Sequence, residues 1–175
     1  MPIISPYGTG TIITHADAFR VNNSFTGNVN PITNFERVDT DNFNNIGTGM
    51  GLSSGTFSFP VTGIWQITCI GSFYASSGFR SRYNGVEMLA TTNNSSYDNC
   101  ARFYCNLGTN YGTGYSNGIC QHIFDVSNVS THKIRFMTEV EYSGVGFDAG
   151  SSHSQNLFTF IRLGAVSYTH LRAHE

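Results

Sequence analysis

Charged side chains are scarce in this chain, and lysine is nearly absent. Only 11% of the 175 residues are charged, the formal net charge is −2, and Lys133 is the single lysine. A protein that binds nucleic acid usually carries a basic patch that neutralises phosphates, so the composition argues against such a partner. No apolar run approaches the roughly 18 residues of a membrane-spanning helix. The first ten residues also lack the basic and apolar segments of a secretory signal peptide.

Motifs for metal binding are missing as well. The four cysteines show no C-x-x-C spacing, and no histidine pair completes a zinc pattern. Without a secretory signal we interpret them as buried or incidental thiols, and we predict no metal site and no cofactor. The acidic residues that could supply calcium oxygens form no dense D-x-D-x-D loop, so we interpret them as solvated turn residues. These residues are Cys69, Cys100, Cys105 and Cys120, and Asp39, Asp41, Asp98 and Asp148.

Catalytic motifs are equally hard to find. The four histidines that lie before the C-terminal tail are isolated from one another, and no serine has nucleophile-elbow spacing. Glu139 and Glu141 fall on one face of a predicted strand, and two carboxylates can perform glycosidase chemistry. A solvated strand face, or an ion pair with Arg135 of another subunit, explains that pair more simply. We therefore predict a protein that is not an enzyme. The histidines are His15, His122, His132 and His153.

The residues that are abundant favour strands and turns. Aromatic residues make up 14% of the chain, glycine occurs 19 times, and good helix formers are few. Alternating polar and apolar residues predict roughly eight to ten strands, which suits an all-β fold: a two-sheet antiparallel jelly-roll sandwich of about ten strands. Asn84-Gly85 is the pattern of a type I′ turn and predicts a β-hairpin over residues 80–87. The other predicted strands cover residues 17–21, 32–38, 55–60, 63–74, 101–107, 119–126, 133–142 and 157–163.

A characteristic order of motifs runs from residue 17 to residue 165. An aromatic strand and a polar turn precede Gly55-x-Phe57-x-x-Pro60-x-x-Gly63-x-Trp65, followed by the Asn-Gly hairpin and a closing aromatic strand. This order resembles the globular-head domain of complement component one-q, which shares its jelly roll with tumour necrosis factor. The residues that carry the resemblance, and that we expect in the core and turns, are Phe19, Phe35, Phe43, Phe57, Pro60, Gly63, Trp65, Asn84, Gly85, Phe158 and Phe160. Residues 1–16 form an arm before this domain.

The resemblance also carries an expectation about function. The closing segment 158–163 and the Asn-, Gly- and Ser-rich composition look more like the versions of this domain in marine bacteriophages. That implies a virion component, a capsid decoration or tail-fibre tip, assembled in the host cytoplasm. Its partners would be a glycan or protein of the host surface, or neighbouring virion subunits. A secreted, extracellular lectin-like defence protein is the alternative, and a polysaccharide-acting enzyme on a β scaffold is a further one without a motif in its favour.

Two features of the sequence suggest how such a module would bind. Predicted loops at residues 91–99 and 108–118 place tyrosines among Gly, Ser and Asn, a mixture typical of recognition loops, although a plain solvent-exposed loop has the same composition. The candidate binding residues are Tyr97, Tyr111, Tyr115, Asn110 and Asn117.

Segments 64–74, 119–126 and 157–163 are apolar on both faces, whereas a sandwich buries only one face of a strand. The second face requires a cover, which a homotrimer supplies, as the resemblance also implies.

Residues 166–175 do not continue the strand pattern. Their sequence, VSYTHLRAHE, resembles the translation of a sequencing adapter, which implies a metagenomic source and an artificial tail. We predict that deleting residues 166–175 leaves the melting temperature unchanged, and calorimetry of both forms checks this. A fall of more than about 4 °C, on the order of 1 kcal/mol for a domain of this size, would show that the tail stabilises the fold.

Overall fold

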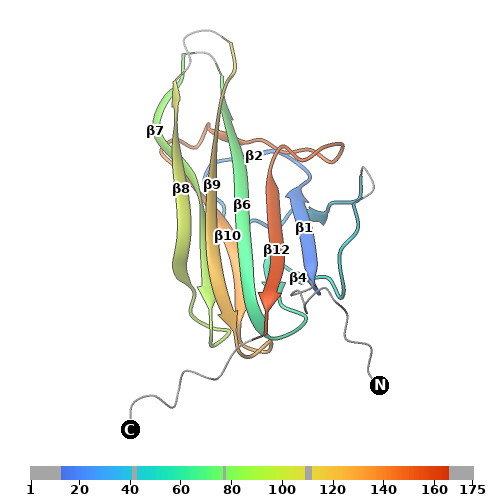
Figure 1. The fold of residues 1–175 in the computed structure, drawn as a ribbon. Coiled ribbons are helices and arrows are strands. Elements are labelled where there is room, and N and C mark those ends of the chain that lie inside the picture. The colour runs from blue at the N-terminus through green and yellow to red at the C-terminus, as the bar shows by residue number, and fades with distance from the viewer. Residues whose placement is uncertain (1–12, 41–42, 77, 109–111, 166–175) are drawn as a thin grey trace, which may run out of the picture.

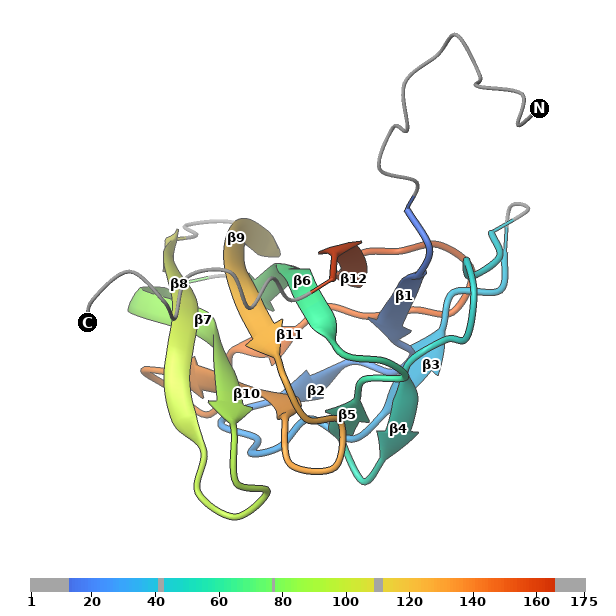
Figure 2. The same cartoon turned by 60° about the horizontal axis from the view of Figure 1, so that its bottom comes forward.

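Two antiparallel sheets lie face to face in this protein and enclose one core (Figures 1 and 2). The structure is a computed structural model that describes residues 13–40, 43–76, 78–108 and 112–165. The predicted all-β, two-sheet antiparallel sandwich is confirmed. Its strands are β1 (Ala16–Val21), β2 (Phe25–Thr26), β3 (Phe35–Arg37), β4 (Gly51–Ser53), β5 (Thr56–Ser58), β6 (Gly63–Ala75), β7 (Arg80–Thr91), β8 (Asp98–Gly108), β9 (Gly114–Val126), β10 (Lys133–Val140), β11 (Gly146–Phe147) and β12 (Leu157–Gly164).

The larger sheet is organised around β6. This strand pairs with β9 on one side and with β12 and β11 on the other; β1 and β3 continue the sheet beyond β12, and β2 pairs with β11. The smaller sheet has the order β4-β5-β10-β7-β8. Among the described residues, β9 pairs only with β6 and β8 pairs only with β7, so both are edge strands. They lie on the same side of the sandwich (Figure 1).

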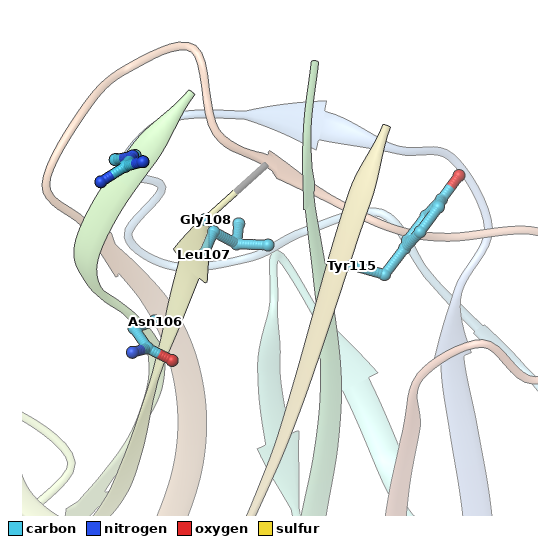
Figure 3. Close-up of a pocket in the computed structure, with 5 residues that line it drawn as sticks. Asn106, Leu107, Gly108 and Tyr115 are labelled. Carbon is cyan, nitrogen blue, oxygen red and sulfur yellow. The ribbon is translucent and has the colours of Figure 1, made fainter. Parts of the chain in front are cut away.

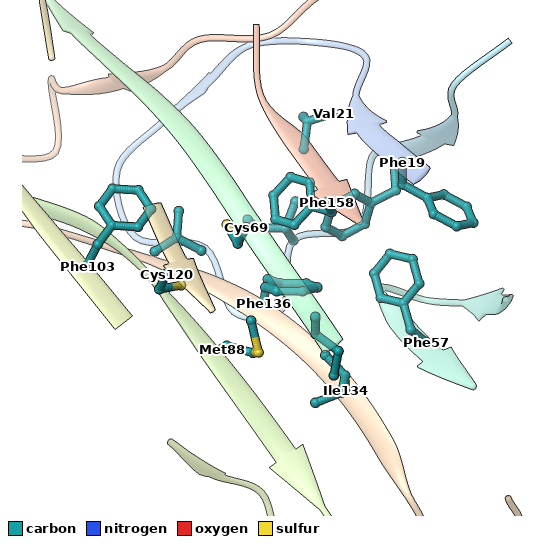
Figure 4. Close-up of a cluster of buried hydrophobic side chains, with 14 of the residues drawn as sticks. Phe19, Val21, Phe57, Cys69, Met88, Phe103, Cys120, Ile134, Phe136 and Phe158 are labelled. Carbon is teal, nitrogen blue, oxygen red and sulfur yellow. The ribbon is translucent and has the colours of Figure 1, made fainter. Parts of the chain in front are cut away.

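Phenylalanine rings fill the space between the sheets (Figure 4). Phe57 of the smaller sheet lies edge-on to Phe19, with 5.0 Å between ring centroids, and 4.9 Å from Phe160. Trp65 is 1% exposed, and its indole Nε1 donates a hydrogen bond to the carbonyl of Val61. Edge-to-face packing of this kind adds to the free energy of simple burial. Phe35 and Phe158 also belong to this core cluster, whereas Phe43, which belongs to the polar turn of the sequence pattern, is half-buried and lies outside it.

The alternation read from the sequence matches burial along the long strands. On β10, Ile134, Phe136, Thr138 and Val140 are buried, while the residues between them are partly exposed. Because side chains alternate between the two faces of a strand, this pattern orients β10 with one face toward the core. The alternation of polar and apolar residues therefore predicts which face of a strand is buried, wherever the other face is exposed to water.

The predicted turn at Asn84-Gly85 is wrong. Both residues lie within β7, between β10 and β8, with Asn84 opposite Val140 and Gly85 opposite Tyr104. Asn84 is fully buried and donates a hydrogen bond from Nδ2 to the carbonyl of Cys105. A Cβ on Gly85 would lie 2.1 Å from the carbonyl oxygen of Phe103. Glycine is therefore needed here because two strands approach each other closely, and not because the chain turns.

Other boundaries differ from the predictions because short strands lack a clear period. The segment predicted as a strand over residues 32–38 pairs only at Phe35–Arg37, and β4 was not predicted. β11, whose two residues are both buried, lies outside the strands predicted from the sequence. The predicted loop at 108–118 ends at Gly114, where β9 begins. In each case tertiary pairing, which the local pattern does not record, decides the boundary.

Trp65 provides a direct test of the core. We expect Trp65→Ala to lower the free energy of unfolding by about 3–5 kcal/mol, since it removes a large, fully buried aromatic side chain. Urea denaturation followed by far-ultraviolet circular dichroism measures this change. A loss below about 1 kcal/mol, typical of a surface position, would contradict the placement of Trp65 in the core.

Candidate functional site: the outer face of the larger sheet

The structure places the two predicted tyrosine-bearing loops far apart. The β7–β8 connection follows the pairing of Ala90 with Asp98, whereas the β8–β9 connection follows the pairing of Arg80 with Gly108. These pairs lie at opposite ends of β7, so the two connections lie at opposite ends of the sandwich. Tyr97 and Tyr115 therefore do not form a single site, because successive antiparallel strands turn at alternate ends.

Tyr97 has a structural partner. The guanidinium carbon of Arg135 lies 3.9 Å from the centroid of its ring, a cation–π contact between the loop and β10. In the same loop the side-chain oxygen of Asn93 accepts hydrogen bonds from the backbone N–H groups of Ser95 and Ser96. This loop is thus fastened internally and to the smaller sheet, which leaves the Tyr97 ring less available to a ligand.

The remaining candidates divide in two. Asn110 and Tyr111 lie outside the described residues. Tyr115 and Asn117 were predicted in a loop, but both lie on β9, and both side chains are exposed. The prediction failed because glycines and asparagines hide the alternation at the beginning of this strand.

A cavity of about 480 Å³ lies where β7 and β9 begin and β8 ends (Figure 3). Its lining combines a guanidinium, an amide and apolar atoms, a mixture that suits a polar ligand such as a sugar. In Figure 3 the ring of Tyr115 points away from Leu107 and Asn106, so it does not cover the cavity. The cavity is lined by Arg80, Asn106, Leu107, Gly108 and Tyr115.

A larger feature lies on the face of β9, β6 and β12 that points away from the core. Residues directly opposite in the β6–β9 and β6–β12 ladders share this face, which we call the outer face. It consists of Tyr115, Asn117, Ile119, Gln121, Ile123 and Asp125 of β9, Ile64, Gln66, Thr68 and Ile70 of β6, and Leu157, Thr159 and Ile161 of β12. Among these residues Asp125, opposite Ile64 near the end of β9, is the charged one.

Isoleucines dominate the exposed area of the outer face. Ile119 is 60% exposed and Ile123 is 52% exposed, and Ile70 lies between Ile119 and Leu157 in one cross-strand row. In the next row Gln121 donates a hydrogen bond from Nε2 to the hydroxyl of Thr68, at 3.0 Å. The apolar row of Ile119, Ile70 and Leu157 lies on one side of this paired row, and on the other side Gln66 lies between Ile123 and Ile161. Such a surface is suited to contact with another protein surface.

The opposite face of the sandwich carries charged side chains, several of which bond with one another. Glu87 accepts a hydrogen bond from the hydroxyl of Tyr104 at 2.9 Å and another from the amide of Asn99, while Tyr104 also bonds with Glu139. Arg102 lies 3.7 Å from Glu87. Burial raises the pKa of Glu87, but these hydrogen bonds and the charge of Arg102 outweigh it and hold that pKa below its ordinary value.

Glu139 and Glu141 therefore do not act as a pair. Glu141 follows the end of β10 and accepts a hydrogen bond from Nε of Arg82 at 2.6 Å. Arg135 contacts Tyr97 rather than either carboxylate. Within the chain Glu141 pairs with Arg82 and Glu139 with Tyr104, so the two carboxylates have different partners.

Comparison with known proteins adds no family. Neither the family models nor the curated proteins searched match the chain. The described part of the chain contains no helix with the length and hydropathy needed to cross a membrane. Within the same residues, no three His, Cys, Asp or Glu side chains are grouped so that they could hold a metal ion. The outer face is therefore the feature on which a function can be argued.

The pKa of Glu87 predicts how stability depends on pH. Since that pKa is lower in the folded state, ionised Glu87 stabilises the fold above its ordinary pKa of about 4.3 and loses this effect as pH falls through the folded value. Glu87→Gln should therefore show a smaller fall in the free energy of unfolding between neutral pH and about pH 3. Urea titrations at a series of pH values measure it. Equal slopes in both proteins would contradict this assignment.

Proposed function

We propose that this chain is a non-enzymatic structural or adhesion module of a virion, which works as a homotrimer and binds a host surface or neighbouring virion subunits. The observation that carries the proposal is the outer face, a surface on three adjacent strands that exposes several isoleucines and has its charge, Asp125, at one end. The resemblance to the jelly-roll domains of complement component one-q and marine bacteriophages supplies the virion context and the threefold symmetry.

The outer face requires a cover in water. Exposed isoleucines scattered singly are ordinary on a protein surface, but Ile119, Ile70 and Ile123 lie on neighbouring strands of one sheet face. Burial of apolar surface contributes roughly 25 cal/mol per Å², so covering this patch favours association. The chain has few charges elsewhere to keep it dispersed, with 11% charged residues in the whole sequence.

Further copies of the same chain suit this surface better than a charged partner would. The outer face carries no charge between Tyr115 and Ile123, so identical faces approach without electrostatic repulsion. It also reaches the edge of the larger sheet at β9, where a rotation axis can bring copies together without a clash from further strands. Closed rotational symmetry then covers the patch on every copy.

Trimerisation also explains how weak contacts could hold a host surface. With the outer faces turned toward the axis, the ends of the three sandwiches lie side by side, and each displays a cavity lined by Arg80 and Asn106. A guanidinium and an amide can bind sugar hydroxyls or carboxylates, although a single shallow site binds weakly. Three linked sites raise the overall affinity by about 10²–10⁴-fold when they engage together.

The oligomeric state tests this proposal. Light scattering coupled to size exclusion should give a mass three times the 19.2 kDa of one chain. Ile123→Glu should give a monomer because it places a charge in the centre of the interface. Ile46→Glu is the matched control, since Ile46 is 47% exposed, close to the 52% of Ile123, but lies outside the outer face. A wild-type monomer at micromolar concentration would refute the trimer and the multivalent binding that depends on it.

A further inference from the structure

Two of the four cysteines lie directly opposite each other in the larger sheet. Cys69 on β6 and Cys120 on β9 are register partners in the antiparallel ladder. Both side chains point into the core, where Cys69 is fully buried and Cys120 is 7% exposed. Figure 4 shows both among the buried side chains between the sheets.

This placement satisfies the geometric requirement for a disulfide. Directly opposite residues of antiparallel strands have Cα atoms about 4.5 or 5.5 Å apart, depending on the type of pair. A disulfide spans Cα separations of about 4.4–6.8 Å. The Cα separation of such a pair therefore permits the bond, provided that the two side chains rotate until the sulfurs meet.

The two thiols are also chemically unequal. Burial raises the pKa of Cys69, which keeps that side chain protonated and able to donate a hydrogen bond. The hydrogen bond from Cys69 lowers the pKa of Cys120, because it stabilises the thiolate of Cys120. Since the thiolate is the reactive form of cysteine, Cys120 is the sulfur that reacts first with an oxidant.

We propose that Cys69 and Cys120 form a cross-strand disulfide when the folded protein meets hydrogen peroxide. The Cys120 thiolate attacks one peroxide oxygen, the O–O bond breaks, and Cys120 sulfenic acid and hydroxide result; the hydroxide takes up the proton lost by Cys120. The Cys69 sulfur then attacks the Cys120 sulfur and displaces the hydroxyl group, which leaves as water with the Cys69 proton. In total, two thiols are oxidised to one disulfide and one peroxide is reduced to two waters.

The other two cysteines are held differently. The thiol of Cys100 donates to the carbonyl of Met88, and the thiol of Cys105 donates to the carbonyl of Asn84, each at 3.3 Å. Both cysteines lie on β8 in the smaller sheet, and both thiols bond to the neighbouring strand of that sheet. The register pairs neither with another cysteine. The pair of Cys69 and Cys120 is therefore the one that oxidation should join.

The bond would fasten an edge strand to the centre of its sheet. β9 pairs only with β6 among the described residues, and it carries the most exposed side chains of the outer face. A disulfide from Cys69 to Cys120 closes a covalent loop that contains β7 and β8. While that bond is intact, β9 cannot separate from β6 at this position. The protein could then fold with reduced thiols and gain stability later, outside the reducing cytoplasm. This inference does not depend on the proposed function.

Oxidation of the folded protein tests the proposal. We expect hydrogen peroxide treatment to remove two hydrogens from the intact mass, a peptide map to show Cys69 linked to Cys120, and the melting temperature to rise by about 5–15 °C. Dithiothreitol should reverse all three changes. Cys69→Ala and Cys120→Ala should each abolish the link and the rise, whereas the matched control Cys105→Ala should retain both.

Three results would overturn the proposal. A map that links Cys100 to Cys120 would show that another pair is closer in solution. Sulfinic acid at Cys120 without a disulfide would show that Cys69 cannot reach the oxidised sulfur. An unchanged intact mass, under conditions that oxidise a small thiol completely, would show that the pair is inert. The mapping of the wild-type protein decides among these even if an alanine variant fails to fold.

Discussion

The alternation of side chains along β6 is the constraint on which the rest of the structure depends. Trp65, Ile67, Cys69 and Phe73 point inward and are buried, while Gly71 interrupts this row. Gly71 pairs with Gly118 on β9, and a Cβ on Gly118 would lie 2.0 Å from the ring of Phe103. The two glycines therefore admit an aromatic side chain from the smaller sheet, which brings the edges of the two sheets together.

The same alternation divides the surface of the sandwich into two unlike faces. On the smaller sheet, outward carboxylates and hydroxyls such as those of Glu87 and Tyr104 bond with one another, so that face is satisfied within one chain. On the larger sheet the outward residues of β6 and β9 include the exposed isoleucines Ile70, Ile119 and Ile123. An asymmetry of this kind separates a surface that meets water from one that is suited to a partner.

The edge strand β9 connects the two proposals. Its outward residues supply the most exposed part of the outer face, and its inward Cys120 lies opposite Cys69. An edge strand is normally the part of a sheet that opens most easily, because it has a ladder on one side only. Association would cover one face of β9 and a disulfide would hold the other, so both would oppose opening of the same strand.

The sequence by itself determined the all-β class and the core-facing residues of the long strands. In segments such as 63–74 and 133–142, apolar residues recur at every second position, and this local alternation is enough to identify the buried face. It also indicated that β6, β9 and β12 are apolar on both faces. Only the tertiary structure placed these strands side by side, set Tyr97 and Tyr115 at opposite ends, and put Cys69 opposite Cys120. It also moved Asn84-Gly85 from a turn into a buried strand. Pairing between residues distant in sequence decides these features, and no local pattern records it.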